Sequence, residues 1–185
     1  GRVHPHLEIK IVDEQGKVVP RGQLGELCVR GYSVMLGYWE DHEKSGEVID
    51  SARWMHTGDI AEMDEAGFVK IKGRIKDVVI RGGENLFPKE IEDFLYTHPD
   101  VSDVQVIGLP DARYGEELCA CIILHEHHEI TEESIRQYCA EHISHNKVPR
   151  YVRFFNEFPM TASGKAQKFK LQEFMHNELD LKEIA

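Results

Sequence analysis

The segment 73–92 reads GRIKDVVIRGGENLFPKEIE, and its character changes several times along its length. It begins with a glycine and two basic residues, continues through a β-branched run, and reaches the pair Gly82 and Gly83 before Pro88. β-branched residues favour a strand, paired glycines allow the positive φ angles of a tight turn, and proline fits the first turn of a helix. The segment therefore predicts a joint, a strand, a turn and a helix in close succession.

The residues before this segment have the pattern of short strands. Residues 7–37 alternate apolar and polar side chains between glycine and proline punctuation. The segments 59–63 and 67–72 are predicted to pair as antiparallel strands across the turn DEAG, where Gly67 can supply a positive φ angle. We therefore expect an all-β, barrel-like segment over residues 1–75.

The residues after the segment alternate helices with strands. A helix is predicted to begin at Pro88, because apolar residues recur there at helical spacing. Thr131 can cap a second helix, and a last helix is expected from about residue 166. The apolar faces of the three helices are Ile91, Phe94 and Leu95; Ile135, Tyr138, Cys139 and His142; and Leu171, Phe174 and Met175. Strands are expected at about 104–109, 117–124 and 151–155.

These elements predict an α+β fold with two unequal parts. The all-β segment at 1–75 is followed by a compact α+β domain at 76–185, whose helices surround a central three-stranded sheet. The net charge of −11 and the isoelectric point near 5.4 argue against a chain that grips nucleic-acid phosphates. The sequence contains neither an apolar run long enough for a membrane span nor a secretory leader.

The cysteines and histidines do not have metal-ligand spacing. Cys28, Cys119, Cys121 and Cys139 form no C-x-x-C pair, so free buried thiols are expected, with Cys119 and Cys121 on one face of a strand. The run HEHHE at 125–129 is expected to be a solvated loop. We therefore predict no metal site.

Several short motifs point to nucleotide chemistry, and each also has a plainer interpretation. Asp59, in WMHTGD, could accept hydrogen bonds from ribose hydroxyls, although Thr-Gly-Asp is more often a turn. Arg74 could donate to a sugar or phosphate, or lie on the surface. The glycines of RGGEN allow another chain to approach, or form a hairpin turn. Lys165, after a glycine, could bring positive charge to a developing anion, or be solvated.

The order of these motifs is more specific than any one of them. WMHTGD, GRIKDVVIRGGENLFPKEIE, HNKVPRYVRF and PMTASGKAQKFKL together resemble the last motifs of the adenylate-forming superfamily, which includes acyl-CoA synthetases, peptide adenylation domains and beetle luciferases. The resemblance covers essentially the whole chain. The runs RGYSVMLGYW and SGKAQKFKL are most similar to medium-chain fatty acyl-CoA synthetases of the family-member-two type.

The resemblance implies a role for several residues. It implies that Asp59 binds the ribose hydroxyls with support from Arg74, and that Lys76 is the hinge of a C-terminal lid domain. Gly83, with Gly82 and Glu84 beside it, matches the lining of a pantetheine tunnel. A further match is Lys165, which corresponds to the lysine that contacts the carboxylate and α-phosphate during adenylation.

The resemblance also implies an incomplete enzyme. The phosphate loop of the family lies upstream of these motifs, so we expect residues 1–75 to be the end of a larger N-terminal domain and 76–185 to be the lid. The substrates implied are a fatty acid, ATP and CoA, with Mg²⁺ accompanying ATP but no ligands for it here. The location implied is the cytoplasm in a bacterium, or the mitochondrial matrix in a eukaryote.

Two other functions remain open at this stage. A carrier-protein-loading adenylation enzyme would use a similar tunnel glycine, and a non-catalytic binding module would need neither Asp59 nor Lys165. We expect the isolated chain to be inactive as an enzyme, because the phosphate loop and the acyl pocket are missing. The oligomeric state and the acyl chain length are not visible in these residues.

Overall fold

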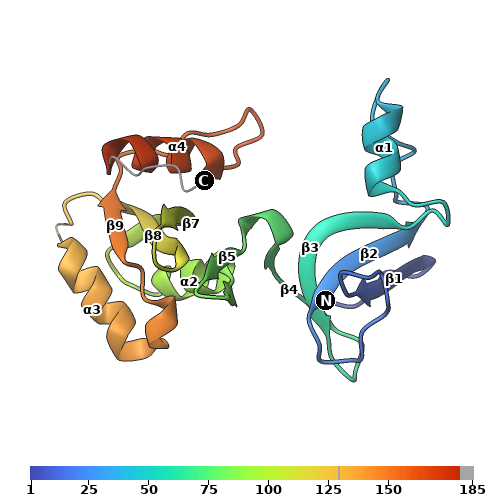
Figure 1. The fold of residues 1–185 in the computed structure, drawn as a ribbon, viewed down its shortest axis with the longest axis horizontal. Helices are drawn as coiled ribbons and strands as arrows, with labels where there is room; N and C mark the ends of the chain where they lie inside the picture. The colour runs from blue at the N-terminus through green and yellow to red at the C-terminus, as the bar shows by residue number, and fades with distance from the viewer. Residues whose placement is uncertain (129, 180–185) are drawn as a thin grey trace. The chain divides into compact units, whose positions relative to one another are not determined.

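A computed structural model describes residues 1–128 and 130–179 of the chain. The chain forms two compact units, Gly1–Lys76 and Asp77–Ala185 (Figure 1). The first unit contains one antiparallel sheet. Its elements are β1 (Leu7–Val12), β2 (Gly25–Gly31), α1 (His42–Val48), β3 (Met55–Met63) and β4 (Val69–Arg74). The sheet order is β1-β2-β3-β4, so each strand pairs with the next one along the chain.

The first unit departs from the prediction in two respects. In the part of the chain that the structure describes, β1 and β4 do not pair with each other, so the sheet stays open and the expected barrel-like closure is wrong. Four strands leave two edges, and a closed barrel requires partners for both. The turn between β3 and β4 follows the prediction, since Gly67 has a φ of +81°.

The second departure is the helix α1, because residues 1–75 were expected to be all β. Its N-cap is Asp41, whose carboxylate accepts a hydrogen bond of 2.9 Å from the backbone N–H of Lys44. The helix buries none of its residues, so it has no apolar periodicity for a sequence pattern to detect. The cap was therefore the available signal for this helix.

The second unit contains a mixed sheet with three helices. Its elements are β5 (Val79–Arg81), β6 (Glu84–Leu86), α2 (Pro88–Leu95), β7 (Val101–Asp111), β8 (Gly115–Leu124), α3 (Glu132–His142), a 3₁₀ turn η2 (His145–Lys147), β9 (Tyr151–Phe154) and α4 (Lys168–Glu178). A further 3₁₀ turn, η1 (Ile75–Asp77), lies at the boundary of the units. This combination of separate helices and sheets confirms the predicted α+β class.

The sheet of the second unit has five strands where three were predicted. The predicted strands are β7, β8 and β9, with β8 antiparallel to β7 and parallel to β9. The hairpin β5–β6 adds the other two, through a single pairing of Arg81 with Gly115. A pairing across that sequence distance leaves no local pattern, which explains why the sequence did not indicate it.

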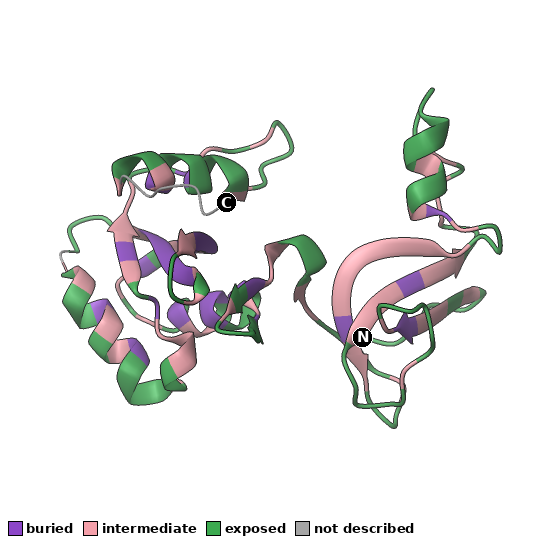
Figure 2. Cartoon of the chain, viewed as in Figure 1, coloured by how far each residue is buried: buried purple, intermediate pink, exposed green. Residues whose placement is uncertain are grey.

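Both faces of this sheet are covered. On one face, residues of α2 and α3 pack against alternate residues of β7 and β8, and Figure 2 shows the buried positions along these strands. The opposite face receives Leu171 and Met175 of α4, which face the core as predicted. They pack with Cys119 and Cys121, which share one face of β8 as predicted. Phe174 is a correction, because its side chain was expected inside the core and is 51% exposed.

The helix starts of the second unit follow the sequence signals. Pro88 is in the first turn of α2, and Thr131 caps α3 with a reciprocal pair of hydrogen bonds to Ser134. Among the described residues, no helix is both long enough and apolar enough to cross a bilayer.

Candidate active site

The strand β3 bends at the motif Thr57, Gly58 and Asp59. The pairing register between β2 and β3 shifts at this point, and Gly58 has a φ of +70°. An extra residue with a positive φ forms a β-bulge, which turns the side chain that follows it. Asp59 is that residue, and its side chain is 27% exposed. The glycine is therefore required by the backbone geometry, and the bulge sets the direction of the carboxylate.

Asp59 and Arg74 lie directly opposite each other on neighbouring strands. They are a register pair of β3 and β4, and the distance from Arg74 Nε to Asp59 Oδ1 is 3.1 Å. The arginine side chain is 52% exposed, so about half of its surface is open to solvent. The structure thus brings together the two residues that the sequence analysis assigned to a sugar. A carboxylate beside a guanidinium can accept from hydroxyl groups while the guanidinium donates to oxygen.

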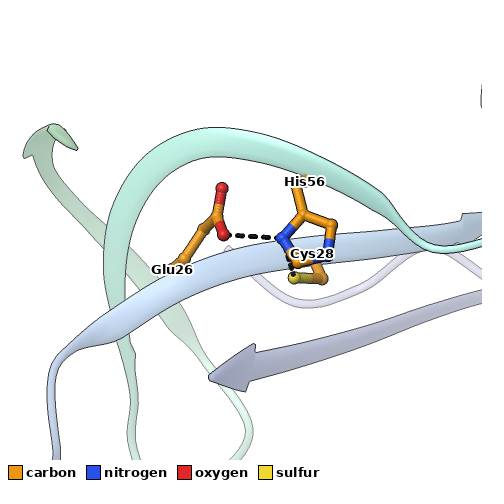
Figure 3. Close-up of side chains that lie close together, drawn as sticks. All are labelled: Glu26, Cys28 and His56. Atoms are coloured by element: carbon orange, nitrogen blue, oxygen red, sulfur yellow. Dashed lines mark hydrogen bonds and ion pairs between the residues drawn. The ribbon is translucent and has the colours of Figure 1, made fainter. Parts of the chain in front are cut away.

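A cluster of Glu26, Cys28 and His56 lies behind the bulge, and sequence reasoning missed it. In Figure 3 dashed lines join one nitrogen of the His56 imidazole to the carboxylate of Glu26 and to the thiol of Cys28. The distances from His56 Nδ1 are 2.7 Å to Glu26 Oε2 and 3.6 Å to Cys28 Sγ. Alternate positions of β2 place the carboxylate and thiol on one face, but only the register pairing of Cys28 with His56 brings the imidazole there.

The same cluster contains three kinds of metal ligand. Its ligand atoms all lie within 4.8 Å of one another, and the sequence analysis had predicted no metal site. Cys28 is fully buried. Burial, and secondarily the nearby charge of Glu26, raises the pKa of the Cys28 thiol to about 11. Metal binding needs the thiolate, so the raised pKa of Cys28 opposes metal binding at this position.

Gly82 and Gly83 form the two-residue turn of the β5–β6 hairpin. Their φ angles are +60° and +85°, and Arg81 and Glu84 are the pair that closes the turn. Positive φ at both central positions is the geometry of a type I′ turn, for which two glycines are well suited. A Cβ atom built on Gly83 would meet no atom within 4 Å. The tip of the turn is therefore open, and another molecule could approach its backbone closely.

The glycine turn is anchored at both ends. Arg81, on the strand before it, forms two hydrogen bonds of 2.7 and 3.0 Å to the carboxylate of Glu117, which is buried. Glu84, after the turn, accepts a hydrogen bond of 2.6 Å from Asn146 Nδ2. The backbone N–H of Gly82 donates to the carbonyl oxygen of Tyr114 at 2.8 Å. The residues on both sides of the open tip are therefore fixed by hydrogen bonds.

Lys165 lies in an exposed turn before α4. The backbone of the turn is closed by a hydrogen bond of 2.8 Å from Thr161 N–H to the carbonyl oxygen of Lys165, and Gly164 has a φ of +76°. Among the described residues, the Lys165 ammonium group forms neither a hydrogen bond nor an ion pair. Its neighbour Lys168 differs, because its Nζ atom lies 2.6 Å from Glu92 Oε1 in the α4 contact with the sheet.

The predicted site residues therefore fall into separate groups. Asp59 and Arg74 are together in the first unit, whereas the glycine turn with Glu84 and the turn with Lys165 are in the second. Lys76 is exposed, lies in η1, and is the last residue of the first unit. Lys76 therefore lies at the boundary of the two units.

Comparison with known proteins identifies the class of protein. Residues 90–165 match the family described as AMP-binding enzyme C-terminal domain, and residues 1–39 match the AMP-binding enzyme family. The anthranilate CoA ligase AuaEII, solved in complex with anthranoyl-AMP, is 36% identical with a TM-score of 0.88, over 98% of this chain and 36% of that one. The chain belongs to the adenylate-forming, AMP-binding enzyme family.

Within that family, the sequence is more than 50% identical to those of several acyl-CoA ligases and synthetases. The medium-chain acyl-CoA ligase ACSF2, mitochondrial, of Bos taurus is 54% identical over 182 residues, which are 98% of this chain and 30% of the relative. The putative acyl-CoA synthetase YngI of Bacillus subtilis is 51% identical over 174 residues, which are 94% of this chain and 32% of the relative. The chain thus spans about 30% of the length of the curated relatives it matches.

Proposed function

We propose that these residues are part of an AMP-forming acyl-CoA ligase that acts on medium-chain fatty acids. In the first half-reaction, the fatty acid carboxylate attacks the α-phosphorus of ATP, and pyrophosphate leaves to give acyl-AMP. In the second, the CoA thiol loses its proton and attacks the acyl carbon, and AMP leaves to give acyl-CoA. The identity to ACSF2, which extends over nearly the whole chain, is the observation that carries the proposal.

The adenylation step brings several negative charges together. We assign Asp59 to the ribose hydroxyls of ATP, because its carboxylate is partly exposed and has acceptor capacity left beside Arg74. We assign Lys165 to the reacting carboxylate and α-phosphate, where an ammonium group stabilises the crowded charge. Its exposed turn and unengaged ammonium group suit a residue that is needed in one half-reaction and withdrawn in the other.

The thioester step needs a path for the pantetheine arm of CoA. We assign this path to Gly83, with Gly82 and Glu84 beside it, because the turn has no side chain at its tip. Residues 76–185 would be the lid domain, and residues 1–75 the last part of the larger N-terminal domain. Lys76 would be the hinge about which the lid rotates between the half-reactions.

The proposal also covers the partners and location of the enzyme. ATP and CoA are substrates, Mg²⁺ would accompany ATP without ligands from these residues, and the main partner would be the rest of the same enzyme. The mitochondrial name of ACSF2 supports the mitochondrial matrix if the source is a eukaryote, and the cytoplasm is proposed if it is a bacterium.

Product analysis of the full-length enzyme tests the proposal. The enzyme is incubated with ATP, CoA and fatty acids of increasing chain length, and acyl-CoA is measured by liquid chromatography. We expect acyl-CoA formation that depends on all three substrates and is fastest with medium-chain acids. Transfer to a carrier protein but not to CoA would assign the chain to a carrier-loading enzyme instead, and no acyl transfer at all would favour a binding module.

The 185-residue chain provides a complementary test. Because the phosphate loop and acyl pocket of the family lie outside it, we expect no pyrophosphate exchange that depends on carboxylate. Exchange well above background with radiolabelled pyrophosphate would show that these residues suffice for adenylation, and would contradict the division of labour proposed above.

A further inference from the structure

We propose that Glu26 is a positioning residue, which fixes the β3 bulge and thereby orients Asp59 toward the ribose. This inference rests on the proposed function, because it gives Asp59 the ribose as its ligand. Glu26 lies on β2, and its side chain is 20% exposed. The sequence analysis gave it no role.

Both carboxylate oxygens of Glu26 are engaged by the strand that carries Asp59. Oε1 accepts a hydrogen bond of 3.0 Å from the backbone N–H of Gly58. Oε2 lies 2.7 Å from His56 Nδ1. A carboxylate can only accept, so Nδ1 carries a proton and donates it to Glu26. One side chain therefore holds the residues on either side of Thr57.

Thr57 completes the attachment from the other direction. Its hydroxyl donates to the carbonyl oxygen of Leu27 at 2.7 Å and accepts from the backbone N–H of Asp59 at 3.1 Å. The bulge interrupts the β2–β3 ladder, and these side chains satisfy the N–H groups of Gly58 and Asp59 at that point. Removing the Glu26 carboxylate would leave the Gly58 N–H without an acceptor, and the bulge would lose its fixed geometry.

The alternative use of this cluster, as a metal site with Cys28 and His56, fits the contacts less well. The nitrogen of His56 that faces Glu26 and Cys28 is Nδ1, and it donates its proton to Glu26, so only Nε2 keeps a lone pair for a metal ion. The other oxygen of Glu26 is engaged by Gly58. Burial raises the pKa of the Cys28 thiol, which opposes formation of the thiolate that a metal ion needs. The contacts of Glu26 with His56 and Gly58 instead fix the backbone next to Asp59.

A size-matched pair of variants isolates the contact in the 185-residue chain. Glu26→Met keeps the side-chain length but offers no acceptor oxygen, whereas Glu26→Gln keeps a carbonyl oxygen for the Gly58 N–H. The control is Glu62→Met, on the same strand as Asp59, which loses an ion pair of 2.9 Å with Lys72 instead. Hydrogen exchange of backbone amides, measured by NMR, is the readout.

We expect the Gly58 amide to exchange about tenfold faster in Glu26→Met than in the wild type, and to be nearly unchanged in Glu26→Gln and in the control. Equal exchange in all variants would overturn the inference. If the methionine variant does not fold, the wild type still decides, because a Gly58 amide that exchanges as fast as an unstructured one would show that Glu26 does not hold it.

The functional readout is the preference of the full-length enzyme for ATP over 2′-deoxy-ATP, as the ratio of their kcat/KM values. Asp59→Ala should abolish the preference, and Glu26→Met should reduce it about tenfold, because a displaced carboxylate no longer recognises the hydroxyl. A general loss of stability would lower both rates together and leave the ratio unchanged.

The outcomes of this measurement separate the inference from the proposed function. A ratio that falls in Asp59→Ala but not in Glu26→Met would overturn the inference and leave the function standing. A ratio that does not change in Asp59→Ala would overturn the assignment of Asp59 to the ribose, and with it the orienting role of Glu26. The exchange data would then report only on the backbone of the bulge.

Discussion

Asp59 and Lys165 carry opposite charges, and the structure holds them in opposite ways. Asp59 lies half-buried on β3 beside Arg74. It directly follows Gly58 of the bulge, which the side chain of Glu26 on β2 fixes in place. Lys165 lies in an exposed turn, and among the described residues its ammonium group has no partner. Under the proposed function, Asp59 binds the same sugar in both half-reactions, whereas Lys165 serves only one. Under this proposal, the residue that is needed in both half-reactions is held by several contacts, and the residue that is needed in one is not.

The largest effect is expected at Lys165, the loosely held member of this comparison. In the full-length enzyme, Lys165→Ala should lower pyrophosphate exchange about 10²- to 10³-fold, because one preorganised electrostatic contact is lost. Thioester formation from added acyl-AMP should stay near the wild-type rate. The matched control is Lys170→Ala, which removes an exposed lysine on α4. Equal loss in both half-reactions would contradict a role confined to adenylation.

The neighbouring Lys168 should sharpen the comparison. Its ammonium group is paired with Glu92, whereas that of Lys165 has no partner among the described residues. Lys168→Met leaves the buried carboxylate of Glu92 without its cation and should destabilise the chain by about 3 kcal/mol. Urea unfolding of the 185-residue chain measures this. Lys89→Met, which breaks an exposed pair with Asp93, should cost less than about 0.5 kcal/mol. Equal costs would mean that burial does not distinguish the two pairs.

The open glycine turn provides a test of the second half-reaction. Gly83→Leu should slow thioester formation about 5- to 100-fold and spare adenylation, because a side chain would fill the space that pantetheine needs. Part of any effect would be backbone strain, since the φ of Gly83 is +85°. Gly16→Leu is the control, because Gly16 has a φ of +75° and equally open surroundings. A similar loss in both variants would assign the effect to strain.

The smallest effect is expected at Arg74, the exposed partner of Asp59. Arg74→Ala should lower kcat/KM for ATP about 2- to 5-fold and change the free energy of unfolding by less than about 1 kcal/mol, because exposed ion pairs contribute little. Steady-state kinetics and urea unfolding measure the two quantities. A loss as large as that in Lys165→Ala would show that Arg74, not the β2 contacts, holds Asp59 in place.

Local signals predicted most of the second unit. Pro88 and Thr131 fix the first turns of two helices through the proline ring and the capping hydroxyl, and short continuous apolar runs marked β7 and β8. The exposure of Phe174 shows the limit of such patterns. On a helix with a narrow apolar face, only Leu171 and Met175 reach the core, and helical spacing alone does not define how wide that face is.

What the sequence could not provide was long-range register. The pairing of Arg81 with Gly115 enlarges the sheet, and the pairing of Cys28 with His56 assembles the cluster that carries Glu26. Each depends on how distant strands align, and a shift of one residue would turn the side chains to the opposite face. Motif order singled out Asp59 and Arg74 as candidates, but it did not predict the contacts that hold them.

The burial of every native thiol has a practical consequence for following motion. All four cysteines are fully shielded from solvent, and burial raises the pKa values of Cys28 and Cys139 to about 11. Maleimide dyes react with accessible thiolates, so the folded wild-type chain should give almost no labelling. A cysteine introduced at exposed Ala162 would then react alone. A fluorophore attached there could report on the Lys165 turn without removing any native cysteine.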